Sequence, residues 1–205
     1  MIAFGADELM HASRHPRPFS DPGWLFEWKY DGFRCLVRKC GAQVELVSRQ
    51  GKSFNLSFPE VAAAVAAMPG DFVWDGELAT GAGRGVEAFR LLQERARLKL
   101  PKNVIVAARK NPARLFLFDM MIGGRRDLRA LPMLERKVHL RDAFDDTPTL
   151  VFSSSINGAG EAVFDEVRRH GFEGMLAKRL ASPYRAGRTK DWLKIKDSAY
   201  GRQGF

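Results

Sequence analysis

The chain has 205 residues, 45% of them hydrophobic, which is enough to bury the core of one sizeable domain. Its 33 basic and 24 acidic residues give a formal net charge of +9, which favours a polyanionic partner such as nucleic acid. No stretch is apolar for long enough to span a bilayer, no signal peptide is recognisable, and the two cysteines match neither a zinc pattern nor a disulfide framework. We therefore expect a protein of the reducing cytoplasm without a membrane partner.

The N-terminal part of the chain predicts a lead-in followed by short strands. Residues 1–23 are expected to form an irregular lead-in, because their second half is rich in His, Pro, Arg and Ser. From residue 24 onward the pattern predicts strands at 24–28 and 33–37, the second supported by a period of two. Gly41-Ala42 then predicts a turn into a hairpin partner at 43–48.

The rest of the chain alternates irregularly between helical and strand patterns. Helices are predicted at 59–68, 86–99, 131–138 and 163–167, and strands at 72–78, 115–121, 175–179 and 192–196. No shift in composition marks a linker, so we expect a single domain over residues 1–205. The irregular alternation with hairpin-like strand pairs favours an α+β fold with antiparallel sheets.

One lysine stands between two predicted strands, in the segment Glu27-Trp28-Lys29-Tyr30-Asp31-Gly32-Phe33-Arg34. Asp31-Gly32 supplies a turn at which the backbone can approach a ligand closely. A lysine becomes a nucleophile when desolvation or nearby positive charge lowers its pKa. A solvated lysine beside an ordinary hairpin turn has the same local sequence, so the assignment depends on residues elsewhere.

Chemically useful residues recur on the later predicted strands, namely Asp75, Glu77, Phe118, Glu173, Lys178, Lys194 and Lys196. Each alone has an ordinary structural explanation, such as a solvated sheet edge for the Lys-x-Lys pair. Together they supply lysines for phosphates, hard carboxylate oxygens for a divalent metal, an aromatic platform for a purine and polar partners for a ribose. This inventory fits a nucleotide-binding phosphoryl-transfer site with Lys29 as the nucleophile.

The segment KYDGFR, residues 29–34 with its lysine first, resembles the Lys-x-Asp-Gly-x-Arg signature of covalent nucleotidyltransferases. That group comprises ATP-dependent DNA ligases, RNA ligases and mRNA-capping enzymes. The segments SRQG, DGEL, FLFD, EGMLAK and WLKIK resemble its later motifs and follow in the same order. Residues 127–137 resemble bacterial DNA ligases of the end-joining type, and the likeness covers roughly residues 8–200. The chain is therefore similar to the adenylation domain of an ATP-dependent DNA ligase.

The resemblance implies a role for each motif residue. Lys29 would accept AMP from ATP, and Glu173 together with Glu77 would hold Mg²⁺ or Mn²⁺. The implied nucleotide contacts are Glu27 and Phe118 at the adenine, Arg34, Arg49 and Glu77 at the ribose, and Lys178, Lys194 and Lys196 at the phosphates. The implied fold is a pair of antiparallel sheets flanked by helices, with the nucleotide between them, as in the covalent nucleotidyltransferase or ATP-grasp-like arrangement.

The implied reaction transfers AMP from Lys29 to the 5′-phosphate of nicked or broken double-stranded DNA, in bacterial DNA repair or recombination. Such a protein would work in the cytoplasm beside the nucleoid. Family ligases continue into an OB-fold domain, for which residues 197–205 are too few. We therefore expect one of two situations: either the chain is an adenylation domain taken from a longer ligase, or it is a minimal protein for which an OB-fold domain or a repair protein acts in trans.

Two other interpretations remain open at the level of sequence. One is an RNA ligase or a capping-type nucleotidyltransferase, because Glu27 and Phe118 do not settle which nucleotide is used. The other is a non-catalytic relic that only binds nucleic acid. The presence of Lys29, Glu173 and Lys194 argues against the relic.

Overall fold

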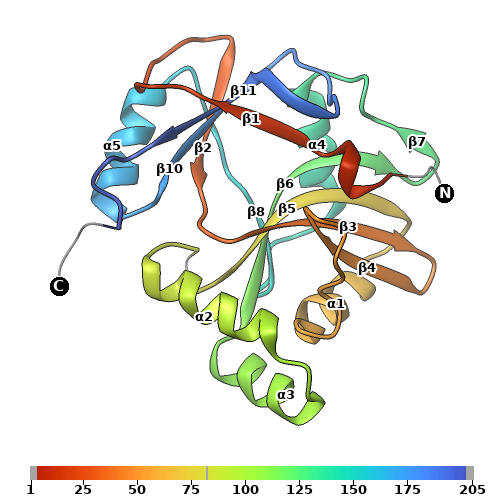
Figure 1. The fold of residues 1–205 in the computed structure, drawn as a ribbon. Helices are drawn as coiled ribbons and strands as arrows, with labels where there is room; N and C mark the ends of the chain where they lie inside the picture. Colours follow the sequence, from red (N-terminus) through yellow and green to blue (C-terminus); the bar gives the residue numbers. More distant parts are fainter. Residues whose placement is uncertain (1–3, 82, 202–205) are drawn as a thin grey trace.

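A computed structural model describes residues 4–81 and 83–201, and its strands form two sheets (Figure 1). The smaller sheet contains, in spatial order, β1 (Met10–Arg14), β11 (Gly187–Lys196), β10 (Gly174–Arg179), β2 (Trp24–Lys29) and β9 (Ile156–Asn157). The larger sheet contains, in spatial order, β4 (Gln43–Ser48), β3 (Phe33–Cys40), β5 (Phe72–Thr80), β6 (Ala113–Gly123) and β7 (Arg126–Asp127), and β8 (Leu150–Phe152) also pairs with β6. The expected α+β fold with two sheets flanked by helices is confirmed.

Helices pack around the two sheets (Figure 1). They are the short 3₁₀ helix η1 (Ala6–Glu8), α1 (Pro59–Ala66), α2 (Val86–Arg97), α3 (Pro101–Lys110), α4 (Met133–Ala143) and α5 (Gly160–His170). Pro59 opens α1, where its missing N–H costs nothing, and Gly171 ends α5 with a left-handed φ of 66°. The sequence patterns had not predicted α3. No described helix is both long and apolar enough to cross a membrane.

Three hydrophobic cores hold the layers together. The first joins the smaller sheet to α5 through Phe26, Phe164 and Val167. The second joins the larger sheet to α1 and α2, and the third fills part of the space between the two sheets. Because both faces of the larger sheet are covered, Cys35 and Val37 pack into the second core while Leu36, on the opposite face, packs into the third. The period of two in β3 is therefore real, although all three side chains are buried.

The expectation of an irregular lead-in over residues 1–23 was wrong for part of that range. It contains η1 and β1, and β1 pairs with β11 in parallel, with His11 opposite Arg188. A second parallel pair joins β6 to β8, so the sheets are not purely antiparallel. The strands β1 and β11 lie near opposite ends of the chain, so local sequence patterns cannot reveal that they pair.

Helix α4 is present where predicted, but its buried face differs from the expected one. The helix was predicted from the apolar spacing of Leu131, Leu134 and Val138, yet the side chains of Leu134 and Val138 are 42% and 53% exposed. Arg136 and Lys137 are buried instead. Charged residues take the inner positions because each meets a buried carboxylate, which a pattern of apolar residues does not register.

Candidate active site

The predicted nucleophile lies where the chain passes from one sheet to the other. Lys29 ends β2 in the smaller sheet and Phe33 begins β3 in the larger one, so the segment is not a hairpin. Gly32 is required at this crossing, because a Cβ there would come within 2.2 Å of the Leu78 carbonyl oxygen. The Asp31 N–H donates a 2.8 Å hydrogen bond to the Gly83 carbonyl oxygen, which fixes the crossing segment.

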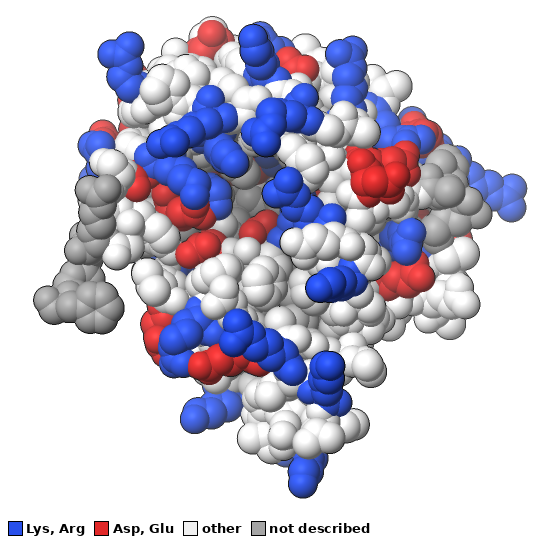
Figure 2. All heavy atoms as spheres, in the orientation of Figure 1, with Lys and Arg blue, Asp and Glu red and all other residues white. Residues whose placement is uncertain are grey.

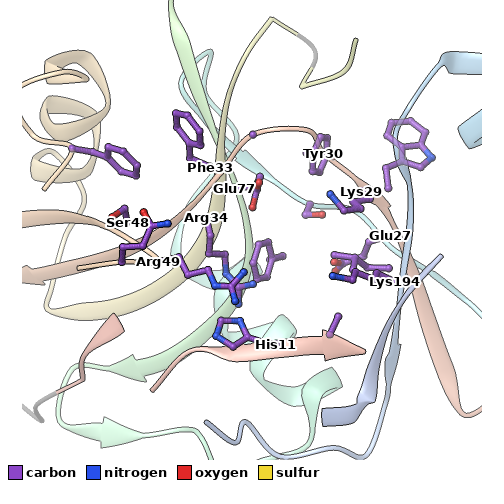
Figure 3. A pocket seen from close by; sticks show the side chains of 18 of the residues that line it. His11, Glu27, Lys29, Tyr30, Phe33, Arg34, Ser48, Arg49, Glu77 and Lys194 are labelled. Atoms are coloured by element: carbon purple, nitrogen blue, oxygen red, sulfur yellow. The ribbon is translucent and has the colours of Figure 1, made fainter. Parts of the chain in front are cut away.

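A pocket of about 550 Å³ opens between the two sheets at this point (Figure 3). The smaller sheet contributes side chains from β1, β2 and β11, and the larger sheet contributes others from β3, β5, β6 and the end of β4. The pocket brings together most of the residues singled out from the sequence: Glu27, Lys29, Arg34, Arg49, Glu77, Phe118 and Lys194. Glu173, Lys178 and Lys196 are not part of its lining.

Glu173 links the nucleophile to a second lysine. Its Oε2 forms an ion pair with Lys29 Nζ, and its Oε1 lies 2.5 Å from Lys196 Nζ. Burial raises the pKa of Glu173, but the two ammonium groups outweigh burial and hold that pKa below its ordinary value. Gly174 opposes Lys29 across β10 and β2, which places the neighbouring Glu173 carboxylate beside the Lys29 amine.

Arg34 contacts a carboxylate rather than open solvent. Its guanidinium makes a bidentate pair with Asp75, and the Tyr184 hydroxyl donates a 2.7 Å hydrogen bond to the same carboxylate. The bidentate geometry fixes the plane of the guanidinium at the wall of the pocket. Asp75 had no assigned role in the sequence analysis, and the structure makes it the anchor of Arg34.

Phe118 forms an aromatic wall that cations contact. Its side chain is buried, with the Lys178 ammonium 4.1 Å and the Arg34 guanidinium carbon 4.8 Å from the ring centroid. Lys178 lies beneath the pocket wall, where its Nζ is 2.7 Å from Glu27 Oε2. Burial lowers the pKa of Lys178 to about 8 although Glu27 opposes the shift. Its assignment to the phosphates stays a prediction, as do the roles of the other residues.

Glu77 is the carboxylate that lines the pocket beside Arg34, its partner across β3 and β5. Burial raises its pKa from 4.5 to about 7, and the positive charges of Lys29 and Arg34 only partly oppose this shift. Among the described residues, no cluster of three or more His, Cys, Asp or Glu side chains is arranged to hold a metal. A magnesium ion carried by nucleotide phosphates needs only one or two protein carboxylates, so Glu173 and Glu77 fit that simpler arrangement.

Besides Asp75, three further residues of the site carried no assignment from the sequence. His11 and Tyr30 line the pocket, and Tyr30 stacks on Phe116 with ring centroids 3.9 Å apart. Lys137 lies behind the pocket wall, where it forms an ion pair with Glu27. The only available signal for Lys137 was its place in the stretch that resembles end-joining ligases, and His11 lay in the supposed lead-in.

Nearly the whole chain matches one known protein family. The family model described as "ATP dependent DNA ligase domain" matches residues 6–196, which include both sheets and every residue of the site. The chain belongs to the ATP-dependent DNA ligase domain family. Its two-sheet fold and the order of its motifs follow from that membership.

Relatives and solved structures of ATP-dependent ligases agree with this assignment. The chain is 38% identical over 178 residues to a probable DNA ligase of Anaeromyxobacter sp., covering 83% of this chain and 33% of that protein. It is 28% identical over 198 residues to the prophage-derived DNA ligase-like protein LigB of Bacillus subtilis, covering 96% and 69%. The crystal structure of the ligase domain from M. tuberculosis LigD superposes with a TM-score of 0.75 at 27% identity, covering 95% of this chain and 61% of that one. The chain thus spans about a third of the Anaeromyxobacter ligase.

Proposed function

We propose that this ligase-family domain takes AMP from ATP onto Lys29 and passes it to the 5′-phosphate of a DNA break. The observation that carries this proposal is the position of Lys29, at the crossing between the sheets, in the pocket and paired with Glu173. A solved mycobacterial DNA ligase D with a similar fold is complexed with ATP, which supports the choice of nucleotide. Membership of an ATP-dependent ligase family favours this function over a capping-type enzyme that uses GTP and over a non-catalytic relic.

In the first step, Lys29 Nζ loses a proton to solvent and attacks the α-phosphorus of ATP. A P–N bond forms, the P–O bond to the β-phosphate breaks, pyrophosphate leaves, and the new phosphoramidate nitrogen releases a second proton to solvent. Glu27 and Phe118 would hold the adenine, while Arg34, Arg49 and Glu77 would hold the ribose. Lys194, at the wall opposite Arg49 in Figure 3, and Lys196 would stabilise negative charge on the phosphates, with Lys178 as a further candidate.

A divalent ion, Mg²⁺ or Mn²⁺, would neutralise phosphate charge when bound. Both oxygens of Glu173 are engaged by lysines, so this carboxylate would exchange at least one ammonium group to become a metal ligand. Glu77 gains its negative charge only near neutral pH, which makes it the weaker of the two candidates below pH 7.

In the second step, a DNA 5′-phosphate oxygen displaces Lys29 from AMP, and the neighbouring 3′-hydroxyl then displaces AMP to seal the strand. Lys and Arg side chains gather around the hollow in the face shown in Figure 2, which suits a polyanion. A relative in Pseudomonas aeruginosa is the multifunctional non-homologous end joining protein LigD, which supports a role in the repair of breaks. We infer that an OB-fold domain or a repair protein completes the closure over DNA.

The test is incubation of the purified chain with labelled ATP and Mg²⁺, followed by denaturing electrophoresis and mass spectrometry. One AMP should appear on Lys29, and neither Lys29→Ala nor Lys29→Arg should be labelled, since arginine keeps the charge but is no nucleophile. Lys102→Ala, on the exposed side of α3, is the matched control and should label normally. AMP on any other residue would reject the assignment, and labelling by GTP instead of ATP would favour a capping-type enzyme.

A further inference from the structure

Glu27 is a buried carboxylate that two lysines hold in place. Its side chain is 1% exposed and lies at the wall of the pocket. Lys137 forms an ion pair with Oε1, and Lys178 approaches Oε2 to 2.7 Å. Burial alone would raise the pKa of Glu27, but the two lysines outweigh it and lower that pKa. The carboxylate that faces the pocket is therefore ionised, and an ionised carboxylate can only accept hydrogen bonds.

Lys137 contacts Glu27 from α4, outside the motif segments to which a nucleotide contact was assigned. It projects from α4, and its ammonium also donates a 2.6 Å hydrogen bond to the Ser153 carbonyl oxygen. The Phe152 ring centroid lies 4.6 Å from the same nitrogen. These contacts fix an ammonium group that does not itself line the pocket. Lys137 can therefore affect a bound nucleotide only through the pocket-lining residues that it contacts, of which Glu27 is the one with an ionised side chain and Ser153 contributes its backbone carbonyl.

Arg136, which precedes Lys137 in α4, also pairs with a buried carboxylate. Arg136 makes a bidentate pair with Asp119, at 2.8 and 2.9 Å, and Asp119 directly follows Phe118 in β6. Consecutive residues of one helix therefore pair with Glu27 and with the residue that follows Phe118, and Glu27 and Phe118 are the two pocket-wall residues that are expected at the adenine. This pairing explains why α4 turns charged side chains inward and leaves Leu134 exposed.

We propose that Lys137 is a positioning residue for nucleobase selection, which orients the Glu27 carboxylate to accept a hydrogen bond from the 6-amino group of adenine. The inference rests on the proposed function, because it takes the pocket as the site of ATP. A purine without the 6-amino group offers this carboxylate no donor, and a 6-oxo purine presents a second acceptor to it. Removing the positive charge of Lys137 frees the carboxylate to rotate. The preference for adenine over purines without the 6-amino group should then decrease.

The experiment compares self-adenylation with ATP and with purine riboside triphosphate, which lacks the 6-amino group. The wild-type protein should prefer ATP by about ten- to a hundredfold in kcat/KM, as expected for a hydrogen bond to a charged group. Glu27→Gln and Lys137→Met should each lower this preference markedly. The double variant should lower it no further than Glu27→Gln alone, because Lys137 acts through Glu27.

Controls separate positioning from mere structural support. Arg141→Met removes an exposed cation from the same helix and should keep the wild-type preference. Lys137→Arg keeps the charge and should retain more of the preference than Lys137→Met. If Lys137→Met slows both substrates equally and leaves their ratio unchanged, the proposal is overturned. Should that variant fail to fold, Lys137→Gln decides, because it keeps an N–H donor, removes the charge and must still lower the ratio.

The two proposals fail in different ways. If the wild-type protein never carries AMP on Lys29, the proposed function is wrong. If it does carry AMP there but the Lys137 variants discriminate as the wild type does, only the inference about Lys137 is wrong.

Discussion

Glu173 holds the amine of Lys29 in an ion pair, and this contact joins the end of β2 to the residue that precedes β10. The predicted nucleophile and the predicted metal ligand are therefore in direct contact. Glu173 restrains the lysine, and this contact would have to loosen for Lys29 to attack a phosphate.

Replacing Glu173 should slow adenylation strongly without unfolding the protein. Glu173→Gln removes the charge that both Lys29 and Lys196 contact, and loss of such charge stabilisation commonly costs about a hundred- to a thousandfold in rate. The rate of AMP labelling is measured across a range of Mg²⁺ concentrations. Glu166→Gln, an acid on α5, serves as the control. Unchanged labelling at low Mg²⁺ would mean that Glu173 neither holds the metal nor orients Lys29.

Arg136 should matter far more to stability than another arginine of the same helix. Arg136→Met leaves the fully buried Asp119 without its partner, which should cost about 3–5 kcal/mol in the free energy of unfolding. Arg141→Met breaks exposed pairs with Asp145 and Asp146 and a contact with the Phe152 ring, and should cost less than about 1 kcal/mol. Urea unfolding measures both, and Arg136→Met with Asp119→Asn should recover part of the loss. Equal effects of the two single variants would contradict the burial of the Asp119 pair.

The raised pKa of Glu77 predicts how stability depends on pH. Between its ordinary pKa of 4.5 and about 7, the folded state keeps a proton on Glu77 that the unfolded state has lost. The unfolded state binds fewer protons in this window, so rising pH destabilises the wild-type protein there. Glu77→Gln mimics the protonated form and lacks this loss. Its stability relative to the wild type should therefore grow from pH 4.5 to about 7 and level off above, as thermal melts at several pH values would show; a constant difference would refute the shift.

Arg188 should contribute to DNA binding through phosphate contact alone. It is exposed, lies opposite His11 across β11 and β1, and lines the mouth of the pocket. Arg188→Ala should weaken binding to nicked duplexes of any sequence and reduce the slope of log affinity against log salt by about 0.9. Arg109→Ala, which removes an exposed arginine from α3, should leave the slope unchanged. A slope that both variants reduce equally would indicate binding without a defined face.

The sequence sufficed for the parts of the site that depend on local pattern. Strand alternation and turn residues predicted β2, β3, β5, β6, β10 and β11, and these strands bring Lys29, Glu77 and Phe118 to one pocket. Local pattern could not place Lys137, because its inward orientation depends on Glu27, which is 110 residues away along the chain. The strand β1 escaped detection for the same reason, since its partner β11 lies near the other end of the chain.

The position of β1 at the edge of the smaller sheet has a practical consequence for expressing the protein. A chain begun at residue 20, on the assumption that the preceding residues are dispensable, would leave the backbone of β11 without a partner along one side. It would also lose the 3.0 Å hydrogen bond from the His15 N–H to the Lys194 carbonyl oxygen and uncover the third core, to which Leu9 and Met10 belong. An unpaired strand beside exposed apolar side chains is a template for self-association. Such a shortened protein would aggregate, and its inactivity would say nothing about the chemistry of Lys29.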